Sequence, residues 1–313
     1  MLRLNPVLDE LGSYPFTRLA EAKRSVAARG VQLIDFGIGE PREETPALLR
    51  EAFRDAVEPV SAYPTAEGMP ELREAIAAWA ARRFGPAAAL DPATEVIPTL
   101  GSKEAVFHLA QVVAGDRVVV TAPGYPVPER GARFAGKDVV RIAMPPDLGA
   151  VDWDGVAILW LNYPNNPTGA TAPEGLYERA AELAREHGFV LASDEAYSEL
   201  YFGAPPRSAL ELTDRRNVVV FNTLSKRSSM PGYRAGFAAG DPAIIAALKR
   251  YRPNVGVAPQ HVVQRAAIAA WGDEEHVEQV RGLYRAKRDV LLPALEAAGL
   301  ELAGGDATFF LWM

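Results

Sequence analysis

One lysine, Lys226, lies in a setting that suits covalent chemistry. It follows the apolar run 218–221, is preceded by Thr223 and Ser225, and is followed eight residues later by Arg234. A lysine that acts as a nucleophile must be partly neutral near pH 7, which requires burial or a cationic neighbour. Hydroxyls and a guanidinium are the donors that a phosphate monoester prefers. The pattern suggests pyridoxal phosphate held as a Schiff base, with a surface lysine after a buried strand as the simpler alternative.

Two further apolar runs lead into polar side chains. The run 189–192 precedes Asp194, and Tyr197 follows three residues later. A carboxylate at the end of a hydrophobic strand costs desolvation unless it meets a positive partner, and a protonated pyridine nitrogen would be one. The run 157–162 precedes a loop rich in Asn, Pro and Gly that contains Asn166. That loop could also be only a turn.

Two glycine-containing segments suggest a phosphate site and a stacking ring. Gly101, Ser102 and Lys103 open a predicted helix, where backbone N–H groups and the helix dipole favour a phosphate. Gly-Ser before a helix is, however, usually just a cap. Tyr125 follows another strand-like run, and its ring could stack on a planar ligand or simply pack in a turn.

Composition excludes several other classes of protein. The 313 residues include 49% apolar and 23% charged residues, as in an ordinary globular enzyme. The absence of cysteine excludes disulfides and thiol catalysis, and the four scattered histidines have no metal-ligand spacing, so we expect no metal site. A net charge of −7 without a basic block argues against nucleic acid and membrane partners. Without a signal-peptide-like or membrane-length apolar run, we expect a cytoplasmic protein.

Short apolar runs alternate with helical segments along the chain. Strand-like runs are predicted at 96–99, 117–121, 139–143, 157–162, 189–192, 218–222, 235–239 and 308–312. Helices are predicted at 16–29, from Pro46 with Thr45 as its cap, and at 70–84, 101–113, 126–134, 173–187, 259–271 and 273–298. This alternation predicts an α/β fold with a mostly parallel central sheet flanked by helices. Ligands bind at the carboxyl ends of strands in such sheets.

We expect three regions. Residues 1–40 would form an N-terminal arm and part of a small domain, and residues 41–252 a large domain that binds the cofactor. Residues 253–313, where helical segments dominate, would form a smaller α+β domain at the C-terminus.

Taken together, the motifs resemble those of fold-type I pyridoxal phosphate-dependent aminotransferases of class I/II. Any one motif is weak evidence, but five occur in the family's order and spacing over essentially the whole chain. They are Gly101-Ser102, Tyr125, Asn166-Pro167-Thr168-Gly169, Asp194-x-x-Tyr197, and Thr223-x-Ser225-Lys226 with Arg234. The resemblance implies pyridoxal phosphate as cofactor, amino and 2-oxo acids as substrates, and a homodimer.

The resemblance also implies roles for individual residues. Lys226 would bind the cofactor covalently and move a proton, Asp194 would pair with the pyridinium nitrogen, and Tyr125 would stack on the ring. Asn166 and Tyr197 would hydrogen-bond the 3′-oxygen. The cofactor-binding set is completed by Gly101, Ser102, Lys103, Thr223, Ser225, Arg234 and, from the neighbouring subunit, Tyr63. Substrate would contact Gly39, Asn166 and Tyr14.

A finer resemblance points to N-succinyldiaminopimelate aminotransferases of lysine biosynthesis. It is carried by segments 14–16 with Leu19, 38–42, 193–199, 224–228 and 269–271. It implies N-succinyl-LL-2,6-diaminopimelate as amino donor and 2-oxoglutarate as acceptor. Tyr14, Arg42 and Arg227 are then candidates for binding the extra carboxylates, although each could equally be a surface or packing residue.

One departure from the family pattern concerns the end of the chain. The family's arginine that binds the substrate α-carboxylate follows a strand like 308–312, and this sequence stops at Met313. We therefore expect a truncated chain that binds cofactor and transaminates poorly.

Three alternatives to this assignment are considered. Another amino-acid aminotransferase or a C–S lyase would share the same core. A non-catalytic sensor would also bind the cofactor, but should carry a basic DNA-binding segment. A Ser-x-x-Lys acyl enzyme is excluded because Thr223 stands at the serine position.

Overall fold

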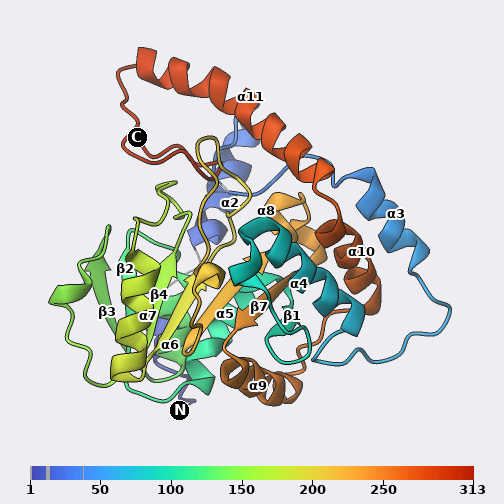
Figure 1. The fold of residues 1–313 in the computed structure, drawn as a ribbon. Helices are drawn as coiled ribbons and strands as arrows, with labels where there is room; N and C mark the ends of the chain where they lie inside the picture. Colours follow the sequence, from blue (N-terminus) through green and yellow to red (C-terminus); the bar gives the residue numbers. More distant parts are fainter. Residues whose placement is uncertain (1, 12–14, 38) are drawn as a thin grey trace. The chain divides into compact units, whose positions relative to one another are not determined.

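The computed structural model describes residues 2–11, 15–37 and 39–313 and divides the chain into two compact units, residues 1–40 and 41–313 (Figure 1). The first unit contains α1 (Val7–Leu11) and α2 (Pro15–Ala27), which confirms the helix predicted at 16–29. Lys23 Nζ pairs with Asp35 at 2.6 Å within this unit. The predicted boundary at residue 252, inside the second unit, stays a prediction.

The second unit is built on a seven-stranded sheet with the order β1-β7-β6-β5-β4-β2-β3. Its strands are β1 (Val96–Thr99), β2 (Arg117–Ala122), β3 (Asp138–Ala143), β4 (Val156–Asn162), β5 (Val190–Asp194), β6 (Val218–Thr223) and β7 (Gly236–Gly240). The pairings from β3 through β6 are parallel, and β7 lies antiparallel between β6 and β1. The predicted mostly parallel sheet is confirmed.

Helices cover both faces of the sheet and form two hydrophobic clusters (Figure 1). The first cluster contains buried side chains of α4 (Pro70–Phe84), α7 (Leu176–His187) and α10 (His261–Gly272). The second contains those of α5 (Gly101–Val112), α6 (Val127–Phe134) and α9 (Pro242–Tyr251). Successive residues of a strand point to opposite faces, so Leu159 of β4 joins the first cluster and Ile158 the second. Burial on both faces explains why the predicted runs at β4 and β6 are apolar almost to their ends.

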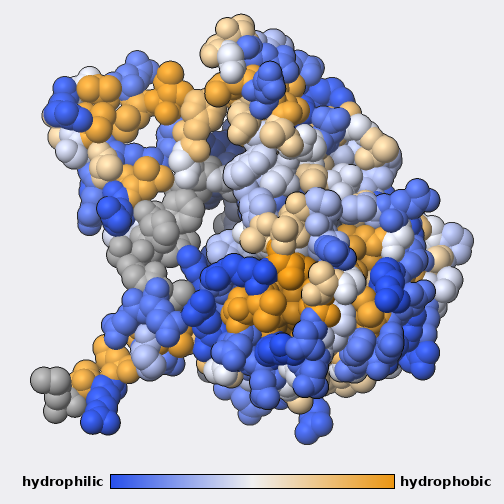
Figure 2. All heavy atoms as spheres, turned by 90° about the vertical axis from the view of Figure 1, so that its left-hand side faces the viewer, coloured by the Kyte–Doolittle hydropathy of each residue, from blue (hydrophilic) through white to orange (hydrophobic). Residues whose placement is uncertain are grey.

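Strand β3 closes one edge of the sheet and carries charged side chains. Asp138 and Arg141 are exposed, and Arg141 pairs with Glu129 of α6. Figure 2 views the molecule from this side and shows apolar areas bordered by hydrophilic side chains. Charges on an edge strand discourage pairing with another chain.

The remaining helices are α3 (Ala47–Asp55), α8 (Leu224–Arg227) and α11 (Glu275–Ala297). The prediction that Thr45 caps α3 was wrong, because its hydroxyl donates instead to the carbonyl of Ser229 at 2.6 Å. No helix within the described ranges is both long and apolar enough to cross a lipid bilayer.

The strand predicted at 308–312 is not formed. An isolated bridge joins Ala307 to Tyr201, and the chain then turns at Thr308, whose φ is 65°. Phe309 packs edge-on against Tyr197 with ring centroids 5.4 Å apart. The aromatic side chains here therefore fill a small cluster next to Tyr197 instead of extending the sheet.

Candidate active site

The carboxyl ends of three neighbouring strands bring predicted site residues together. Asn162 at the end of β4 pairs in register with Asp194 at the end of β5. Asp194 in turn pairs with Phe221, two residues before Thr223 at the end of β6. The side-chain amide of Asn162 also donates to the carbonyl of Asp194 at 3.0 Å. Asn162, Asp194 and Thr223, which are far apart in the sequence, thus lie close together at the carboxyl ends of the parallel strands.

The antiparallel strand β7 brings two further segments to the same end of the sheet. Gly236 at its start pairs with Thr99 of β1 on one side and with Thr223 of β6 on the other. Three segments distant in sequence are thereby joined, namely 99–102, 223–226 and 234–236. We call the polar groups at this junction the cradle, defined by Gly101, Ser102, Thr223, Ser225 and Arg234.

Hydroxyl groups of the cradle are held by hydrogen bonds. The Oγ atoms of Thr223 and Ser225 lie 2.9 Å apart. Thr223 accepts the backbone N–H of Ser225 at 3.2 Å, which caps the start of α8, and donates to the carbonyl of Ala235 at 3.0 Å. Their rotamers are therefore fixed before any ligand binds.

Arg234 lies directly against the first turn of α5. Its Nη2 donates to the carbonyl of Leu100 at 3.1 Å and its Nη1 to that of Pro231 at 2.8 Å. Gly101 has a φ of 65°, and a Cβ at this position would lie 2.7 Å from Arg234 Nη2. A glycine is thus required for this close approach. A helix N-terminus, a guanidinium and the three hydroxyl groups of the cradle are polar groups that fit the phosphate of pyridoxal phosphate.

Asp194 fits the other end of the same cofactor. Its carboxyl is buried, and burial raises its pKa to about 6, although the backbone N–H of Ala196 and the charge of Lys226 both lower it. The negative charge of ionised Asp194 is therefore only partly balanced by Lys226 and the backbone N–H of Ala196. A protonated pyridine nitrogen would supply the missing positive partner.

Lys226 projects from α8 toward an aromatic wall. Its Nζ lies 5.1 Å from the ring centroid of Phe309 and 5.7 Å from that of Tyr197. Burial, followed by the charge of Asp194, raises the pKa of the Tyr197 phenol well above its ordinary value. Tyr197 therefore stays protonated at neutral pH and can donate a hydrogen bond.

The loop after β4 is braced by Asn165, which the sequence motifs did not single out. Its Oδ1 accepts from the backbone N–H and hydroxyl of Thr168 at 3.1 and 2.8 Å. Its Nδ2 donates to the carbonyl of Pro123 at 3.3 Å, two residues before Tyr125. Asn165 thus ties the loop that carries Asn166 to the loop that carries Tyr125. The Asn165-Asn166 doublet was the only signal in the sequence.

Phe309 is the second residue that the sequence reasoning missed. Its ring is the aromatic group over Lys226 described above. The apolar run 308–312 suggested a strand, so nothing in the sequence linked Phe309 to the lysine.

Two of the predicted residues in the second unit are exposed to solvent. Lys103 is exposed on the first turn of α5, and the Tyr63 side chain is fully exposed after α3. Gly39 is exposed in the first unit, and Tyr14 lies outside the described residues.

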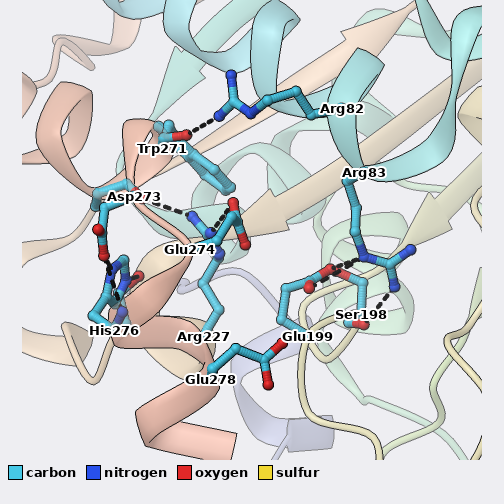
Figure 3. A network of polar contacts seen from close by, with 12 residues as sticks. Arg82, Arg83, Ser198, Glu199, Arg227, Trp271, Asp273, Glu274, His276 and Glu278 are labelled. Carbon is cyan, nitrogen blue, oxygen red and sulfur yellow. Dashed lines mark hydrogen bonds and ion pairs between the residues drawn. The ribbon is translucent and has the colours of Figure 1, made fainter.

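The expectation that Arg227 binds a substrate carboxylate was wrong. Arg227 is 1% exposed, its Nη2 pairs with Glu274 at 3.0 Å, and its Nη1 donates to the carbonyl of Ala270 at 3.1 Å (Figure 3). Its guanidinium also lies 4.6 Å from the Trp271 ring centroid. The arginine is occupied inside the protein and faces α10.

A cavity of about 680 Å³ adjoins the cradle. Leu100 and Arg234 belong to its lining, together with Arg42, Glu43 and Tyr233, but neither Lys226 nor Asp194 does. The cavity therefore adjoins the cradle on a side that Lys226 does not line. Within the part of the chain that the structure describes, no group of acidic, histidine or cysteine side chains could hold a metal ion.

The fold and donor set define a pyridoxal phosphate enzyme built on a mostly parallel sheet. The model of the family "Aminotransferase class I and II" matches residues 31–313. The chain therefore belongs to this family of aminotransferases, and its cofactor is pyridoxal phosphate.

Individual relatives agree with the family assignment. An LL-diaminopimelate aminotransferase from Nitratidesulfovibrio vulgaris (strain DSM 19637 / Miyazaki F) is 40% identical over an alignment 322 residues long, which covers 97% of this chain and 82% of the relative. A protein of the same name from Aquifex aeolicus is 38% identical over 329 residues, covering 100% and 84%.

Solved structures agree as well. An aminotransferase from Neisseria meningitidis Z2491 superposes with a TM-score of 0.90 at 34% identity, covering 99% of this chain and 83% of that one. Aspartate aminotransferase from Thermus thermophilus with maleate gives a TM-score of 0.89 at 31% identity, covering 98% and 84%.

Proposed function

We propose that this aminotransferase binds its cofactor covalently through Lys226 and acts on a diaminopimelate as amino donor, with 2-oxoglutarate as acceptor. The observation that carries the site assignment is the convergence of Lys226, the buried Asp194 and the cradle at one sheet edge. Each of the three suits a different part of pyridoxal phosphate, as described above. When bound, the cofactor supplies an electron sink for the negative charge left on the substrate when Cα loses its proton.

The side chains at the carboxyl ends of the strands would have separate roles in binding and proton transfer. Asp194 in its charged form keeps a proton on the ring nitrogen. Lys226 would be the base that takes the proton from the substrate Cα and returns it. The protonated Tyr197 and the amide of Asn166 donate to or orient the 3′-oxygen, and Tyr125 stacks on the ring. Lys103, on the first turn of α5, would add positive charge near the phosphate.

The choice of amino donor rests on the names of relatives. The proteins from Nitratidesulfovibrio vulgaris and Aquifex aeolicus are named LL-diaminopimelate aminotransferases. Those names favour free LL-diaminopimelate over the N-succinyl form suggested by the sequence motifs. The N-succinyl form is the second candidate, because segments 193–199 and 224–228 resemble that subfamily.

A homodimer is part of the proposal. Tyr63 is 100% exposed and Val60 near it is 79% exposed, so both side chains are accessible to a second copy of the chain. The cavity beside Arg234 offers a place on a second copy where the Tyr63 ring could enter and reach the phosphate site. A cytoplasmic location stays a prediction.

The cofactor assignment is tested by absorbance. The purified chain incubated with pyridoxal phosphate should show a visible band that borohydride reduces, and Lys226→Ala should abolish it, with transamination falling by on the order of a thousandfold. Lys249→Ala is the matched control, because Lys249 donates to the carbonyl of Ala93 on another side of the sheet. A wild-type chain that stays colourless with added cofactor would remove the assignment of Lys226.

The substrate is tested by half-reactions. LL-diaminopimelate, its N-succinyl derivative, aspartate, alanine and phenylalanine would each be mixed with the cofactor-loaded protein, and the loss of the visible band timed. We expect LL-diaminopimelate to react fastest, and 2-oxoglutarate to restore the band. A faster reaction with the N-succinyl form would favour the second candidate, whereas preference for alanine or phenylalanine would exclude both.

A further inference from the structure

The helix that carries Lys226 is too short to be stable alone. Helix α8 spans four residues, Leu224–Arg227. A single helical turn fixes several backbone dihedrals for about one hydrogen bond, so it forms only when its surroundings hold it. The direction of the Lys226 side chain therefore depends on what anchors this turn.

The N-terminal side of α8 is anchored by Thr223 of the cradle, as described above. The C-terminal side is anchored by the two residues that follow Lys226. Arg227 bonds to Ala270 and Glu274, and the hydroxyl of Ser228 lies 2.8 Å from His276 Nε2. Both contacts go to the segment 270–276, where α10 ends and α11 begins (Figure 3).

His276 is itself held by Asp273. Asp273 Oδ2 lies 2.6 Å from His276 Nδ1 and accepts the backbone N–H of His276 at 2.9 Å. A carboxylate can only accept, so Nδ1 carries the proton. Burial lowers the pKa of His276, although Asp273 raises it. The neutral ring then has a bare Nε2, which accepts the hydroxyl proton of Ser228.

Serine, histidine and aspartate in this order form the arrangement found in serine hydrolases. Hydrolysis is excluded here because Ser228 is 0% exposed and His276 is 4% exposed. A carbonyl substrate could not reach the hydroxyl. The three hydrogen-bonded groups therefore act on the protein itself, and the element they contact is α8.

We propose that Ser228, His276 and Asp273 are positioning residues that orient α8, so that Lys226 points at its cofactor. The proposal rests on the assignment of Lys226 made above. Arg227 supports the same anchor with a buried ion pair to Glu274. Three consecutive residues thus divide their roles: Lys226 faces the aromatic wall of the site, while Arg227 and Ser228 attach to the α10–α11 junction.

The experiment compares two buried serines. Ser228→Ala removes the bond to His276, and the control Ser208→Ala removes a hydroxyl that is equally buried and accepts from the backbone of Leu210 at 3.1 Å. The cofactor-free proteins would be mixed with pyridoxal phosphate, the rate of covalent capture followed by absorbance, and the labelled lysine identified by borohydride trapping and peptide mass spectrometry. Thermal unfolding of each cofactor-free protein would be recorded in parallel.

We expect both variants to unfold at lower temperature, since each loses a buried hydrogen bond. Only Ser228→Ala should slow capture at Lys226, by about three- to tenfold, the range that one lost hydrogen bond allows. Equal capture rates for the two serine variants would overturn the proposal. Capture by the wild-type chain at a lysine other than Lys226 would instead overturn the assignment of Lys226 and the positioning role with it.

A second pair of variants covers the case in which Ser228→Ala does not fold. His276→Gln can place its carbonyl oxygen where Nε2 lies and accept from Ser228, whereas His276→Leu cannot. Capture close to the wild-type rate for His276→Gln and slow capture for His276→Leu would support the proposal. The same rate in both would contradict it.

Discussion

Two buried carboxylates at either end of one short loop, Asp194 and Glu199, have opposite surroundings. Both are 2% exposed. Glu199 accepts from Arg83 Nε at 2.9 Å (Figure 3). It also accepts from Arg281 Nη2 at 3.4 Å, so two guanidinium groups of the chain contact it. Asp194 accepts a backbone N–H at 3.3 Å, and its pKa remains raised to about 6 despite the charge of Lys226.

The difference separates a charge that the chain compensates from a charge that it leaves largely uncompensated. Arg83 and Arg281 compensate Glu199 within the protein, which ties α4 and α11 to the loop after β5. Asp194 is buried at the strand end without comparable compensation, which destabilises the cofactor-free protein. A cationic group of a ligand can supply what the chain does not, and perturbed buried carboxylates of this kind gather at functional sites.

The largest effect is expected from Glu199→Gln. Loss of the charge leaves Arg83 and Arg281 without their shared counter-ion, so the free energy of unfolding should fall by about 3–5 kcal/mol. Urea unfolding of the cofactor-free wild-type and variant proteins measures this difference in the free energy of unfolding. Asp214→Asn, which removes an exposed partner of Arg216, is the control and should cost less than about 1 kcal/mol. Similar losses in both variants would contradict the structural role of Glu199.

Asp194→Asn should change stability in the other direction. The folded-state pKa of about 6 lies above the ordinary value of 3.8, so the unfolded chain releases this proton first and the group's stabilising contribution is lost as pH rises through 6. Asparagine does not ionise, so the variant does not lose this stability as the pH rises. Its side-chain oxygen still accepts the backbone N–H of Ala196. The cofactor-free variant should therefore be more stable than wild type above pH 6, by about 3 kcal/mol.

Urea unfolding at about pH 5 and about pH 8 tests the sign, because the advantage of Asp194→Asn should shrink at the lower pH. Transamination should fall in the same variant, since a neutral amide cannot hold a proton on the ring nitrogen. A variant that is destabilised at both pH values would show that the chain itself compensates Asp194.

The smallest effect is expected from Gly101→Ala. A Cβ at this left-handed position strains the backbone by about 1–2 kcal/mol and would displace the Arg234 guanidinium, 2.7 Å away. Cofactor affinity should weaken by about tenfold, whereas Gly136→Ala, where the backbone is also left-handed but a Cβ meets nothing within 4 Å, should show only the strain. Fluorescence titration with pyridoxal phosphate would measure the cofactor affinity of both variants. Equal affinities in the two variants would argue against a phosphate beside Gly101.

Much of the sheet could be predicted because its strands are short and continuously apolar. The runs that became β4 and β6 differ from the prediction by one residue at an end, since burial on both faces leaves apolar side chains in them up to the polar residues at their carboxyl ends. The same runs placed Asn162, Asp194 and Thr223 at strand ends, so the meeting of these residues at one edge followed from the parallel topology.

Other features depend on tertiary contacts that leave no periodic pattern. The run 308–312 has strand-like composition, but the turn at Thr308 and the packing of Phe309 on Tyr197 prevent pairing. Arg227 looks like an available cation beside Lys226, yet its burial is decided by Trp271 and Glu274, far along the chain. The contact between Ser228 and His276 likewise joins residues with no common motif.

The position of β7 between β1 and β6 has a consequence for how the chain is made. A ribosome releases β1 long before β7, and β1 pairs in the sheet with β7. The segment at Gly101 therefore cannot be fixed beside Thr223 until residue 240 has emerged and β7 has inserted. Non-local pairing of this kind forms late. Pyridoxal phosphate would then bind only after β7 has been inserted into the sheet. Its binding would therefore stabilise the molecules in which β7 is correctly paired.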